Sequence, residues 1–307
     1  MFSRLILWLL AIILAVLLFT GGPGYRSPRS FFAAWDLGHV VAFSLWSYLL
    51  VAWNQVSETS PARQWGIVLA FSLVGGAATE GIQFLLGGDF SLGDLLRDIV
   101  GGVITLSWFT SSSRVLPERM RRVTRTFAAT LLLVACLPLA VALSDEVIAR
   151  FQFPVLSDFE TPFETSRWDG GARYSADSSV ARHGKASMRV DMDTSLYSGV
   201  ALVYFPMDWR GYSILSLELL NPSQGGIDIT CRIHDLRHEE WGQRYEDRFN
   251  KVFRLRPGWN HLQIDLKEVA RAPAGRTLDL STIRAVGVFA TRLPTPRTIF
   301  LDHMRLE

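Results

Sequence analysis

Residues 127–143 read FAATLLLVACLPLAVAL, and this stretch divides the chain into two parts of different character. It contains no charged residue and approaches the roughly 20 apolar residues that a bilayer-spanning helix requires. The chain has 307 residues and a mean hydropathy of +0.20, and charged residues are about twice as frequent after position 150 as before it. The sequence therefore predicts a membrane half followed by a water-soluble half.

Four further apolar stretches precede this one. With it, they predict an α-helical membrane bundle of five transmembrane helices, at about Leu5–Thr20, Leu37–Trp53, Trp65–Leu86, Leu92–Phe109 and Phe127–Leu143. The first stretch could instead be a cleaved signal, but residues 18–23 (LFTGGP) lack the small-x-small pattern of a cleavage site. An uncleaved helix is the preferred interpretation.

Arginine decides the predicted orientation, because cytoplasmic loops retain Lys and Arg. The segment between the fourth and fifth stretches is placed inside because it holds Arg114, Arg119, Arg121, Arg122 and Arg125. Arg4 and Arg63 then also lie inside, whereas Arg26 and Arg29 lie outside against the rule. We expect a bacterial inner (cytoplasmic) membrane protein with its amino terminus inside, and with the chain after about Leu143 in the periplasm or outside the cell.

The few ionisable residues within the predicted spans fall at one depth, near the outer leaflet. Such residues normally pair, face the bundle interior and mark function, because a charge in hydrocarbon costs about 2.5–3.5 kcal/mol on insertion scales. Helical spacing places them on faces that can meet. The predicted polar membrane site consists of Asp36, His39, Glu80, Gln83, Asp94 and Asp98. Glycines at 75, 76, 101 and 102 would let the third and fourth helices approach closely.

Each of these polar residues has an alternative explanation. Asp36 and Asp94 could be helix N-terminal acids at the interface, where the helix dipole favours a carboxylate. His39 could be a structural partner of Asp36 or Glu80. Glu80 could make a structural hydrogen bond, although its depth favours a functional or ligand-contacting role. A metal site from His39, Glu80 and Asp94 is conceivable, but the spacing matches no metal-binding signature.

At these residues the chain resembles the VanZ-like family of small membrane proteins, named for an accessory factor in teicoplanin resistance. The resemblance covers about residues 30–110 and depends on residues 36–39 (DLGH), 80–83 (EGIQ) and 90–94 (FSLGD), followed by Gly101 and Gly102. The family usually has Arg where this chain has Gly88 and Asn where it has Asp98; Arg97 could supply the cation but sits elsewhere on the helix. The resemblance implies a cell-envelope role related to glycopeptide resistance, and not a reaction.

From Val155 onward the pattern changes to short alternating runs separated by Gly, Pro, Asn and Asp, which predicts a β-sandwich or barrel of about nine strands. In residues 227–234 (IDITCRIH), for example, apolar and polar residues alternate, so one face is buried and the other is wet. The predicted domains are a transmembrane domain at 1–144, a linker at 145–156 and an exported sandwich at 157–307.

Five short segments of this half resemble jelly-roll carbohydrate-binding modules of the galactose-binding-like superfold. They are residues 158–160 (DFE), 183–187 (HGKAS), 208–212 (DWRGY), 257–260 (PGWN) and 301–302 (LD). The resemblance spans nearly all of residues 155–307 and implies a C-terminal all-β jelly-roll sandwich. It implies a ligand less strongly, because this superfold also carries protein-binding and purely structural domains.

Sugar recognition needs flat aromatic faces for the apolar sides of pyranose rings and planar polar groups for adjacent hydroxyls. Residues 234–250 are the densest such patch, although a charged, solvated hairpin that binds nothing is the alternative. The glycan-binding candidates are Trp168, Tyr174, Tyr197, Arg237, Trp241, Gln243, Arg244 and Tyr245. Trp209 and Trp259 follow turn signals and are expected to pack in the core or at a corner.

Asp302 lies on an otherwise apolar strand face, where a bare carboxylate would be costly. In the resembling modules a structural calcium often joins the first and last strands, which would recruit Glu160 or Asp158 beside Asp302. A salt bridge from Asp302 to Arg189 or Arg305 would serve equally well.

Several classes are disfavoured. A net charge of +2 gives no electrostatic footprint for nucleic acid. Cys136 and Cys231 lie in different halves, so no disulfide is expected. The exported half contains no G-x-S-x-G elbow, no paired Cys/His nucleophile and no Gly-rich phosphate loop.

The leading expectation is a non-enzymatic cell-envelope protein. Its sandwich would bind a cell-surface polysaccharide or lipid-linked glycan, and its polar membrane site would contact a membrane lipid or headgroup. One alternative is an integral-membrane enzyme acting on a lipid-linked sugar or phosphate, with Glu80 or Asp94 as general base and His39 as its partner. Another is a sensor or scaffold whose sandwich binds a protein.

Overall fold

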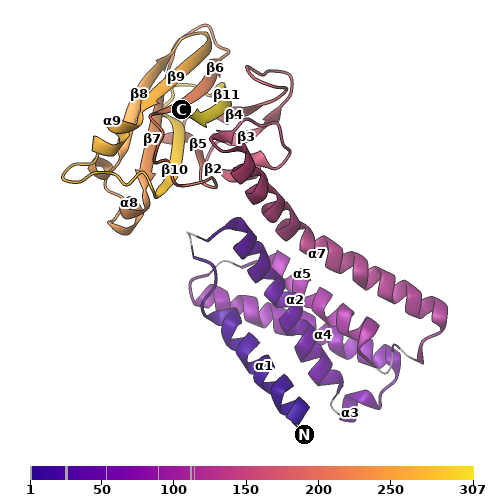
Figure 1. Ribbon diagram of the computed structural model, residues 1–307. Helices are drawn as coiled ribbons and strands as arrows, with labels where there is room; N and C mark the ends of the chain where they lie inside the picture. Colours follow the sequence, from indigo (N-terminus) through magenta and orange to yellow (C-terminus); the bar gives the residue numbers. More distant parts are fainter. Residues whose placement is uncertain (1, 25–26, 53, 89, 111–112, 114) are drawn as a thin grey trace. The chain divides into compact units, whose positions relative to one another are not determined.

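The chain forms two units, Met1–Leu143 and Ser144–Glu307 (Figure 1). The computed structural model describes residues 2–24, 27–52, 54–88, 90–110, 113 and 115–307. Arg26, Trp53 and Arg114, which the orientation and span predictions used, lie outside the described residues.

Every predicted apolar stretch forms a helix. The helices of the first unit are α1 (Phe2–Phe19), α2 (Arg29–Val51), the short α3 (Asn54–Ser57), α4 (Pro61–Leu85) and α5 (Leu92–Trp108), together with α7 (Glu118–Gln152), whose last residues belong to the second unit. Serines begin two of them: Ser60 accepts a hydrogen bond from the Arg63 backbone N–H at the start of α4, and Ser91 accepts one from the Asp94 N–H at the start of α5.

Three of these helices, α2, α4 and α7, are long and apolar enough to cross a membrane. The apolar part of α1, Leu5–Phe19, is shorter, and α5 has only 17 residues, among them Asp94, Arg97 and Asp98. Five transmembrane helices are therefore not confirmed; the structure supports three candidate spans. The difference arises because the apolar run of α1 is too short and that of α5 is short and contains charged residues.

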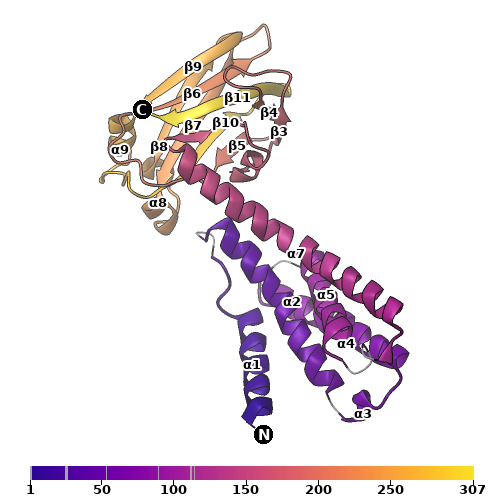
Figure 2. The ribbon, with the colours of Figure 1, turned by 45° about the vertical axis from the view of Figure 1, so that its right-hand side comes forward.

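Helix α5 packs against both α2 and α4 (Figure 2). A Cβ on Gly101 would lie 2.6 Å from the Val40 carbonyl oxygen of α2, and one on Gly102 would lie 2.5 Å from Ser72 Oγ of α4. The expected close approach of α4 and α5 is found at Gly102. We expected Gly101 to serve the same contact. It instead lets α2 approach α5 closely.

The second unit is an antiparallel two-sheet sandwich. Its strands are β1 (Val155–Ser157), β2 (Trp168–Asp169), β3 (Arg173–Asp177), β4 (Ser187–Met192), β5 (Tyr197–Leu202), β6 (Ile214–Asn221), β7 (Ile227–Asp235), β8 (Phe249–Leu255), β9 (Gly258–Asp265), β10 (Ile283–Thr291) and β11 (Arg297–Leu306). The connections hold η1 (Glu164–Arg167), α8 (Leu236–Glu240), η2 (Tyr245–Asp247) and α9 (Leu266–Arg271).

The strand order is that of a jelly roll. One sheet has the order β3-β4-β11-β6-β9, with β1 paired to β11, and the other has the order β2-β5-β10-β7-β8. From β4 to β11 the chain passes to the opposite sheet at every connection except β7 to β8, which gives the two interlocked Greek keys of a double-sheet jelly roll. The predicted all-β jelly-roll sandwich is confirmed.

The sandwich core explains two of the tryptophans. Trp209 is fully buried, as expected. Trp168 is only 3% exposed and its indole N–H donates to Ser157 Oγ at 3.3 Å, so it is a core residue and not the glycan-binding residue that the sequence suggested. Tyr174 is partly buried and its hydroxyl donates to the Trp168 carbonyl oxygen at 2.7 Å.

Residues 145–156, which we expected to form a linker, consist of the end of α7, a turn at 153–154 and the start of β1. Helix α7 continues to Gln152, and β1 begins at Val155. The Asp145 side chain is fully buried, so this segment is part of the second unit.

Candidate functional site

Two places in the chain gather the predicted site residues, one in each unit. In the first unit, His39 of α2, Glu80 of α4 and Asp94 of α5 each offer one ligand atom, and these atoms lie within 4.8 Å of one another. His39 and Glu80 are buried, with exposed fractions of 4% and 0%. The structure therefore brings together three of the six residues of the predicted polar membrane site.

Two more of the six surround this group. His39 Nδ1 lies 2.9 Å from Oδ1 of the buried Asp98. Arg97 pairs with Asp94 and, at 3.1 Å through Nη2, with Asp36. Arg97 thus belongs to the cluster, although the predicted polar membrane site did not include it; its i,i+3 spacing from Asp94 was the signal for this pairing.

Gln83 does not join the cluster. Its Nε2 donates to the Leu18 carbonyl oxygen at 2.9 Å and so connects α4 to α1. Glu80, unlike Gln83, contacts α5: its Oε2 accepts the backbone N–H of Ser91 at 2.6 Å. Ser91 is the residue that caps α5.

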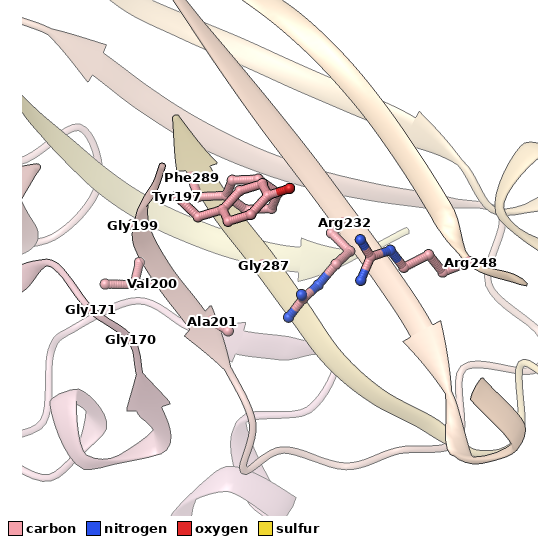
Figure 3. A pocket seen from close by; sticks show the side chains of 10 residues that line it. All are labelled: Gly170, Gly171, Tyr197, Gly199, Val200, Ala201, Arg232, Arg248, Gly287 and Phe289. Atoms are coloured by element: carbon pink, nitrogen blue, oxygen red, sulfur yellow. The ribbon is translucent and has the colours of Figure 1, made fainter. Parts of the chain in front are cut away.

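The second place is an open groove of about 320 Å³ on the outer face of the β2-β5-β10-β7-β8 sheet. Figure 3 labels its lining, which is Gly170, Gly171, Tyr197, Gly199, Val200, Ala201, Arg232, Arg248, Gly287 and Phe289. Volumes of roughly 300–1,000 Å³ are typical of ligand sites.

Strand alternation produces this lining. Val200, Val288 and Cys231 point into the core, so their neighbours in the strands point outward. The register places Gly287 opposite Ala201 on one side and Arg232 on the other, and Phe289 opposite Gly199. Small residues on β5 and β10 therefore form the floor of the groove, and larger side chains form its walls.

The walls combine aromatic and cationic groups. The rings of Tyr197 and Phe289 meet edge to face with centroids 5.8 Å apart, and Tyr197 is 64% exposed. The Arg232 guanidinium lies 6.0 Å from the Phe289 ring centroid, and the Arg248 guanidinium lies 5.4 Å from that of Tyr245.

Of the eight glycan-binding candidates, Tyr197 alone lines this groove. Tyr245 borders it through its contact with Arg248. Trp241 is exposed after α8, where Arg237 and Arg276 lie over its ring at 5.9 and 5.8 Å. Gln243 and Arg244 are also exposed on this connection, outside the groove lining.

A buried polar cluster supports the groove next to Arg232 and Arg248. His234 Nε2 lies 3.4 Å from Glu239 Oε1, and its ring centroid lies 4.8 Å from that of His238. Burial, together with the positive charges of Arg232 and Arg248, lowers the pKa of His234 to about 3. His234 is therefore neutral at physiological pH.

Among the described residues, Asp158, Glu160 and Asp302 do not gather into one group of ligands, and neither salt bridge expected for Asp302 is formed. Asp302 Oδ2 accepts the backbone N–H groups of Arg182 and His183 at 2.6 and 2.9 Å, and Glu160 Oε1 accepts those of Lys185 and Ala186 at 2.6 and 3.0 Å. One oxygen of each carboxylate is therefore bound by backbone N–H groups, whereas Asp302 Oδ1 is buried without a hydrogen-bond partner. Arg189 and Arg305 pair instead with Asp191 and Glu307.

Asp158 is also occupied elsewhere, because its Oδ1 lies 3.4 Å from both Gln152 Nε2 and the Glu160 backbone nitrogen. Among the described residues, the group of three or more His, Cys, Asp or Glu ligands is the one at His39, Glu80 and Asp94. A three-carboxylate calcium site therefore does not fit the sandwich as it is built.

Comparison with known proteins finds similarity only among solved structures. No protein-family model matches the chain, so the resemblance to the VanZ-like family is not supported by one, and no curated protein matches it. The family 11 carbohydrate-binding module from Clostridium thermocellum, in complex with a β-1,3-1,4-mixed-linked tetrasaccharide, is 17% identical; the match covers 50% of this chain and 93% of the module, with a TM-score of 0.39.

Two further structures match at a similar level. The family 30 carbohydrate-binding module of a Clostridium thermocellum cellulosomal cellulase is 17% identical over 46% of this chain and 89% of the module, with a TM-score of 0.38. An exo-β-agarase is 16% identical over 50% of this chain but only 24% of its own length, with a TM-score of 0.41.

Sequence reasoning missed most of the groove. Phe289, Arg232 and Arg248 come from three strands or strand ends that are far apart in sequence, and only the sheet order brings them together. A signal was present at Gly287, because glycine inside a strand often marks close approach of a ligand or another backbone.

Proposed function

We propose that the protein is a cell-envelope membrane protein whose jelly-roll unit binds a glycan in the groove between Tyr197 and Arg248. The observation that carries this proposal is the composition of one continuous groove: two aromatic rings on one side, two guanidinium groups on the other, and a floor of glycine and alanine. A concave site with apolar walls and a few placed polar groups is the usual form of a ligand site.

The shape of the groove suits a chain of sugars. Tyr197 stands on β5 and Arg248 next to β8, and the strands between them are β10 and β7. Three interstrand spacings correspond to about 14 Å. A trough of this length that is open to solvent accepts part of an extended oligosaccharide, whose apolar ring faces pack on Tyr197 and Phe289 while its hydroxyls meet the guanidinium groups.

The charge of the groove favours an acidic glycan. Its lining includes Arg232 and Arg248 and no carboxylate. Guanidinium groups present planar, forked donors that match carboxylate, sulfate and phosphate geometry. We therefore place acidic sugars, with uronate or phosphate groups, ahead of neutral ones.

A membrane location is part of the proposal. Large apolar side chains are highly exposed on the helices of the first unit, as at Leu133 (69%), Val74 (68%) and Leu85 (83%), which a helix in water would avoid. The arginine distribution argues for an inside amino terminus, which puts residues after Ser144 on the outer side, where envelope glycans are.

Binding of acidic and neutral oligosaccharides tests the function. We would titrate the full-length protein in detergent with a uronic-acid oligosaccharide, with its carboxyl-reduced neutral counterpart and with a neutral glucan, using calorimetry. We expect the acidic chain to bind most tightly, and Tyr197→Ala or Arg248→Ala to weaken it about tenfold or more, which corresponds to about 1.4 kcal/mol.

Trp241→Ala is the matched control, because Trp241 is equally aromatic and exposed but lies outside the groove lining. Absence of binding to a broad panel of acidic and neutral glycans would refute the proposal. A loss of binding in Trp241→Ala with none in Tyr197→Ala would move the site to the α8 connection.

A further inference from the structure

The group formed by His39, Glu80 and Asp94 is built from three separate helices. One atom from each residue lies within 4.8 Å of the other two, and His39 and Glu80 are almost completely removed from solvent. Residues that meet in this way from α2, α4 and α5 require the three helices to be packed together, as they are. The group is therefore a product of the tertiary fold and not of one helix surface.

Each member of the group is held through its other polar atom. His39 Nδ1 is hydrogen-bonded to Asp98 Oδ1 at 2.9 Å, which leaves Nε2 available. Glu80 Oε2 accepts the Ser91 N–H at 2.6 Å, and Glu80 Oε1 is buried without a hydrogen-bond partner. Asp94 is bound through Oδ1 by Arg97, which leaves Oδ2.

This pattern is typical of metal ligands and their outer partners. A ligating histidine almost always donates its second ring N–H to a carboxylate or carbonyl, and that partner fixes the tautomer and the ring orientation. Asp98 stands in this position behind His39, with an exposed fraction of 0%. Ser91 and Arg97 orient the two carboxylates in the same way.

The charge balance of the cluster also calls for a cation. The cluster holds four carboxylates, those of Asp36, Glu80, Asp94 and Asp98, and one permanently charged base, Arg97, which pairs with Asp36 and Asp94. An excess of buried negative charge is costly unless positive charge compensates it. Two buried carboxylate oxygens of the cluster, Glu80 Oε1 and Asp98 Oδ2, have no hydrogen-bond partner, and Glu80 Oε1 belongs to the three-residue group itself.

We propose that His39, Glu80 and Asp94 bind one divalent first-row transition metal ion, of which zinc is the best match. Zinc accepts one imidazole nitrogen and carboxylate oxygens at about 2.0–2.2 Å, whereas calcium and magnesium prefer oxygen ligands alone. Tetrahedral ligands at these lengths are roughly 3.4 Å apart, so small side-chain rotations close the group around the ion.

Metal analysis of the purified protein tests this site. Full-length protein in detergent would be stripped with a chelator, reloaded with zinc, and measured by elemental mass spectrometry and by competition with a chromophoric chelator. We expect about one zinc per chain, and an X-ray absorption spectrum with nitrogen and oxygen ligands but no sulfur.

Three variants and one control separate the site from general zinc binding. Glu80→Gln and His39→Ala are expected to abolish stoichiometric zinc. Asp98→Asn, behind His39, is expected to lower the affinity about 10–100-fold. Glu118→Gln is the control, because Glu118 is an exposed acid on α7 paired with Arg122.

The proposal is overturned if the wild-type protein retains far less than one zinc per chain, or if Glu80→Gln retains as much zinc as the wild type. If a variant does not fold, the wild-type stoichiometry and the ligand atoms seen by X-ray absorption still decide: one zinc bound by nitrogen and oxygen supports the site, and zinc bound through sulfur or in no fixed ratio contradicts it.

Discussion

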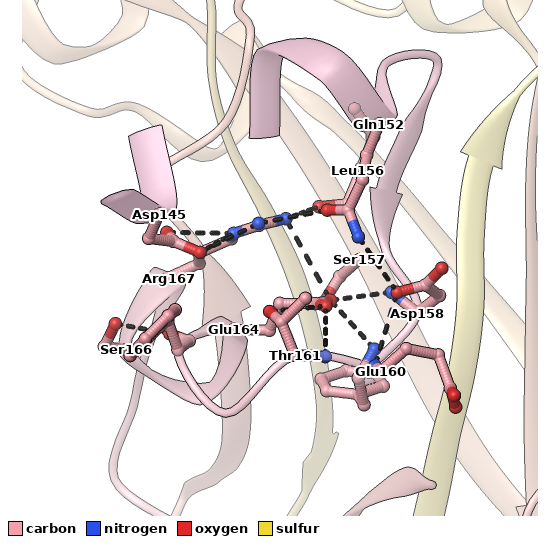
Figure 4. A network of polar contacts seen from close by, with 12 residues as sticks. Asp145, Gln152, Leu156, Ser157, Asp158, Glu160, Thr161, Glu164, Ser166 and Arg167 are labelled. Atoms are coloured by element: carbon pink, nitrogen blue, oxygen red, sulfur yellow. Dashed lines mark hydrogen bonds and ion pairs between the residues drawn. The ribbon is translucent and has the colours of Figure 1, made fainter. Parts of the chain in front are cut away.

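Arg167 and Asp145 form a fully buried ion pair in which Arg167 Nη2 donates to Asp145 Oδ1 at 2.8 Å and Nε donates to both carboxylate oxygens at 3.0 Å (Figure 4). The same guanidinium donates to the Leu156 carbonyl oxygen at 2.9 Å and to Gln152 Oε1 at 3.1 Å. Asp145 lies near the end of α7 and Arg167 at the end of η1, so this contact makes the last turns of α7 part of the sandwich.

Removing Asp145 should therefore destabilise the sandwich. Asp145→Ala leaves the Arg167 charge buried without its partner, and such a loss costs about 3–5 kcal/mol. We would measure the free energy of unfolding of the Ser144–Glu307 fragment in urea. Asp228→Ala, which breaks the exposed pair with Arg254, should cost at most about 1 kcal/mol. Equal effects of the two substitutions would contradict this role of Asp145.

The sequence predicted those features that depend on neighbouring residues. Alternation in 227–234 identified β7, and the apolar runs identified α2, α4 and α7, because side-chain periodicity and length reflect burial directly. The pairing of Asp145 with Arg167, and the meeting of Tyr197 with Phe289, could not be read in the same way. They depend on which strands and helices become neighbours, and no local pattern records that.

The sequence predicted the polar membrane site only in part. Helical spacing correctly suggested that His39, Glu80 and Asp94 could meet, because each span has only one polar face. It could not tell that Gln83 turns to α1, because glutamine can reach a backbone carbonyl on any adjacent helix. Trp168 was misplaced because β2 is short and its burial comes from the whole sandwich.

Filling the groove should abolish binding without unfolding the protein. A Cβ on Gly287 would meet side-chain atoms of Arg232 at 3.4 and 3.6 Å and of Phe289 at 3.6 Å, all ordinary contacts, so Gly287→Phe places its ring in the groove at little cost to the strand. We expect glycan affinity to fall at least tenfold while the thermal midpoint changes little. Gly225→Phe, in open space before β7, serves as the control. Unchanged affinity in Gly287→Phe would exclude the groove as the binding site.

His234, the buried histidine beside the groove, predicts that the stability of the sandwich depends on pH. Because the pKa of His234 is about 3 in the folded protein and about 6.5 when unfolded, the unfolded chain binds the extra proton between these values. This contribution to stability is complete above pH 6.5 and is lost as the pH falls towards 3.

The corresponding measurement compares unfolding free energies at pH 7 and 4.5. The free energy of unfolding should decrease from pH 7 to pH 4.5 in both proteins. This decrease should be about 2–3 kcal/mol smaller in His234→Gln than in the wild-type fragment. His183→Gln, at a half-exposed side chain, is the matched histidine substitution in the same unit. If the His234→Gln and wild-type curves run parallel, His234 is not the group that titrates.

Close helix packing at Gly101 predicts a steric effect in the first unit. Gly101→Val would bring its Cβ within 2.6 Å of the Val40 carbonyl oxygen, whereas Gly66→Val has nothing within 4 Å. Overpacking costs typically 1–3 kcal/mol, and more where backbone is struck. We expect a lower thermal midpoint in detergent for Gly101→Val only; similar midpoints for both variants would show that α2 and α5 do not pack this closely.

The proposed orientation can be tested with single cysteines. Met120 is exposed at the start of α7, and Ser178 is exposed after β3, while the native Cys231 is buried and Cys136 lies within the apolar part of α7. If the amino terminus is inside, an impermeant maleimide added to intact spheroplasts should label Ser178→Cys and should reach Met120→Cys only after permeabilisation. The unsubstituted chain measures the background from the native cysteines. Labelling of Met120→Cys but not Ser178→Cys in intact spheroplasts would place the sandwich in the cytosol. The envelope glycan that we propose as its ligand is absent there, so the proposed orientation and the proposed glycan binding would fail together.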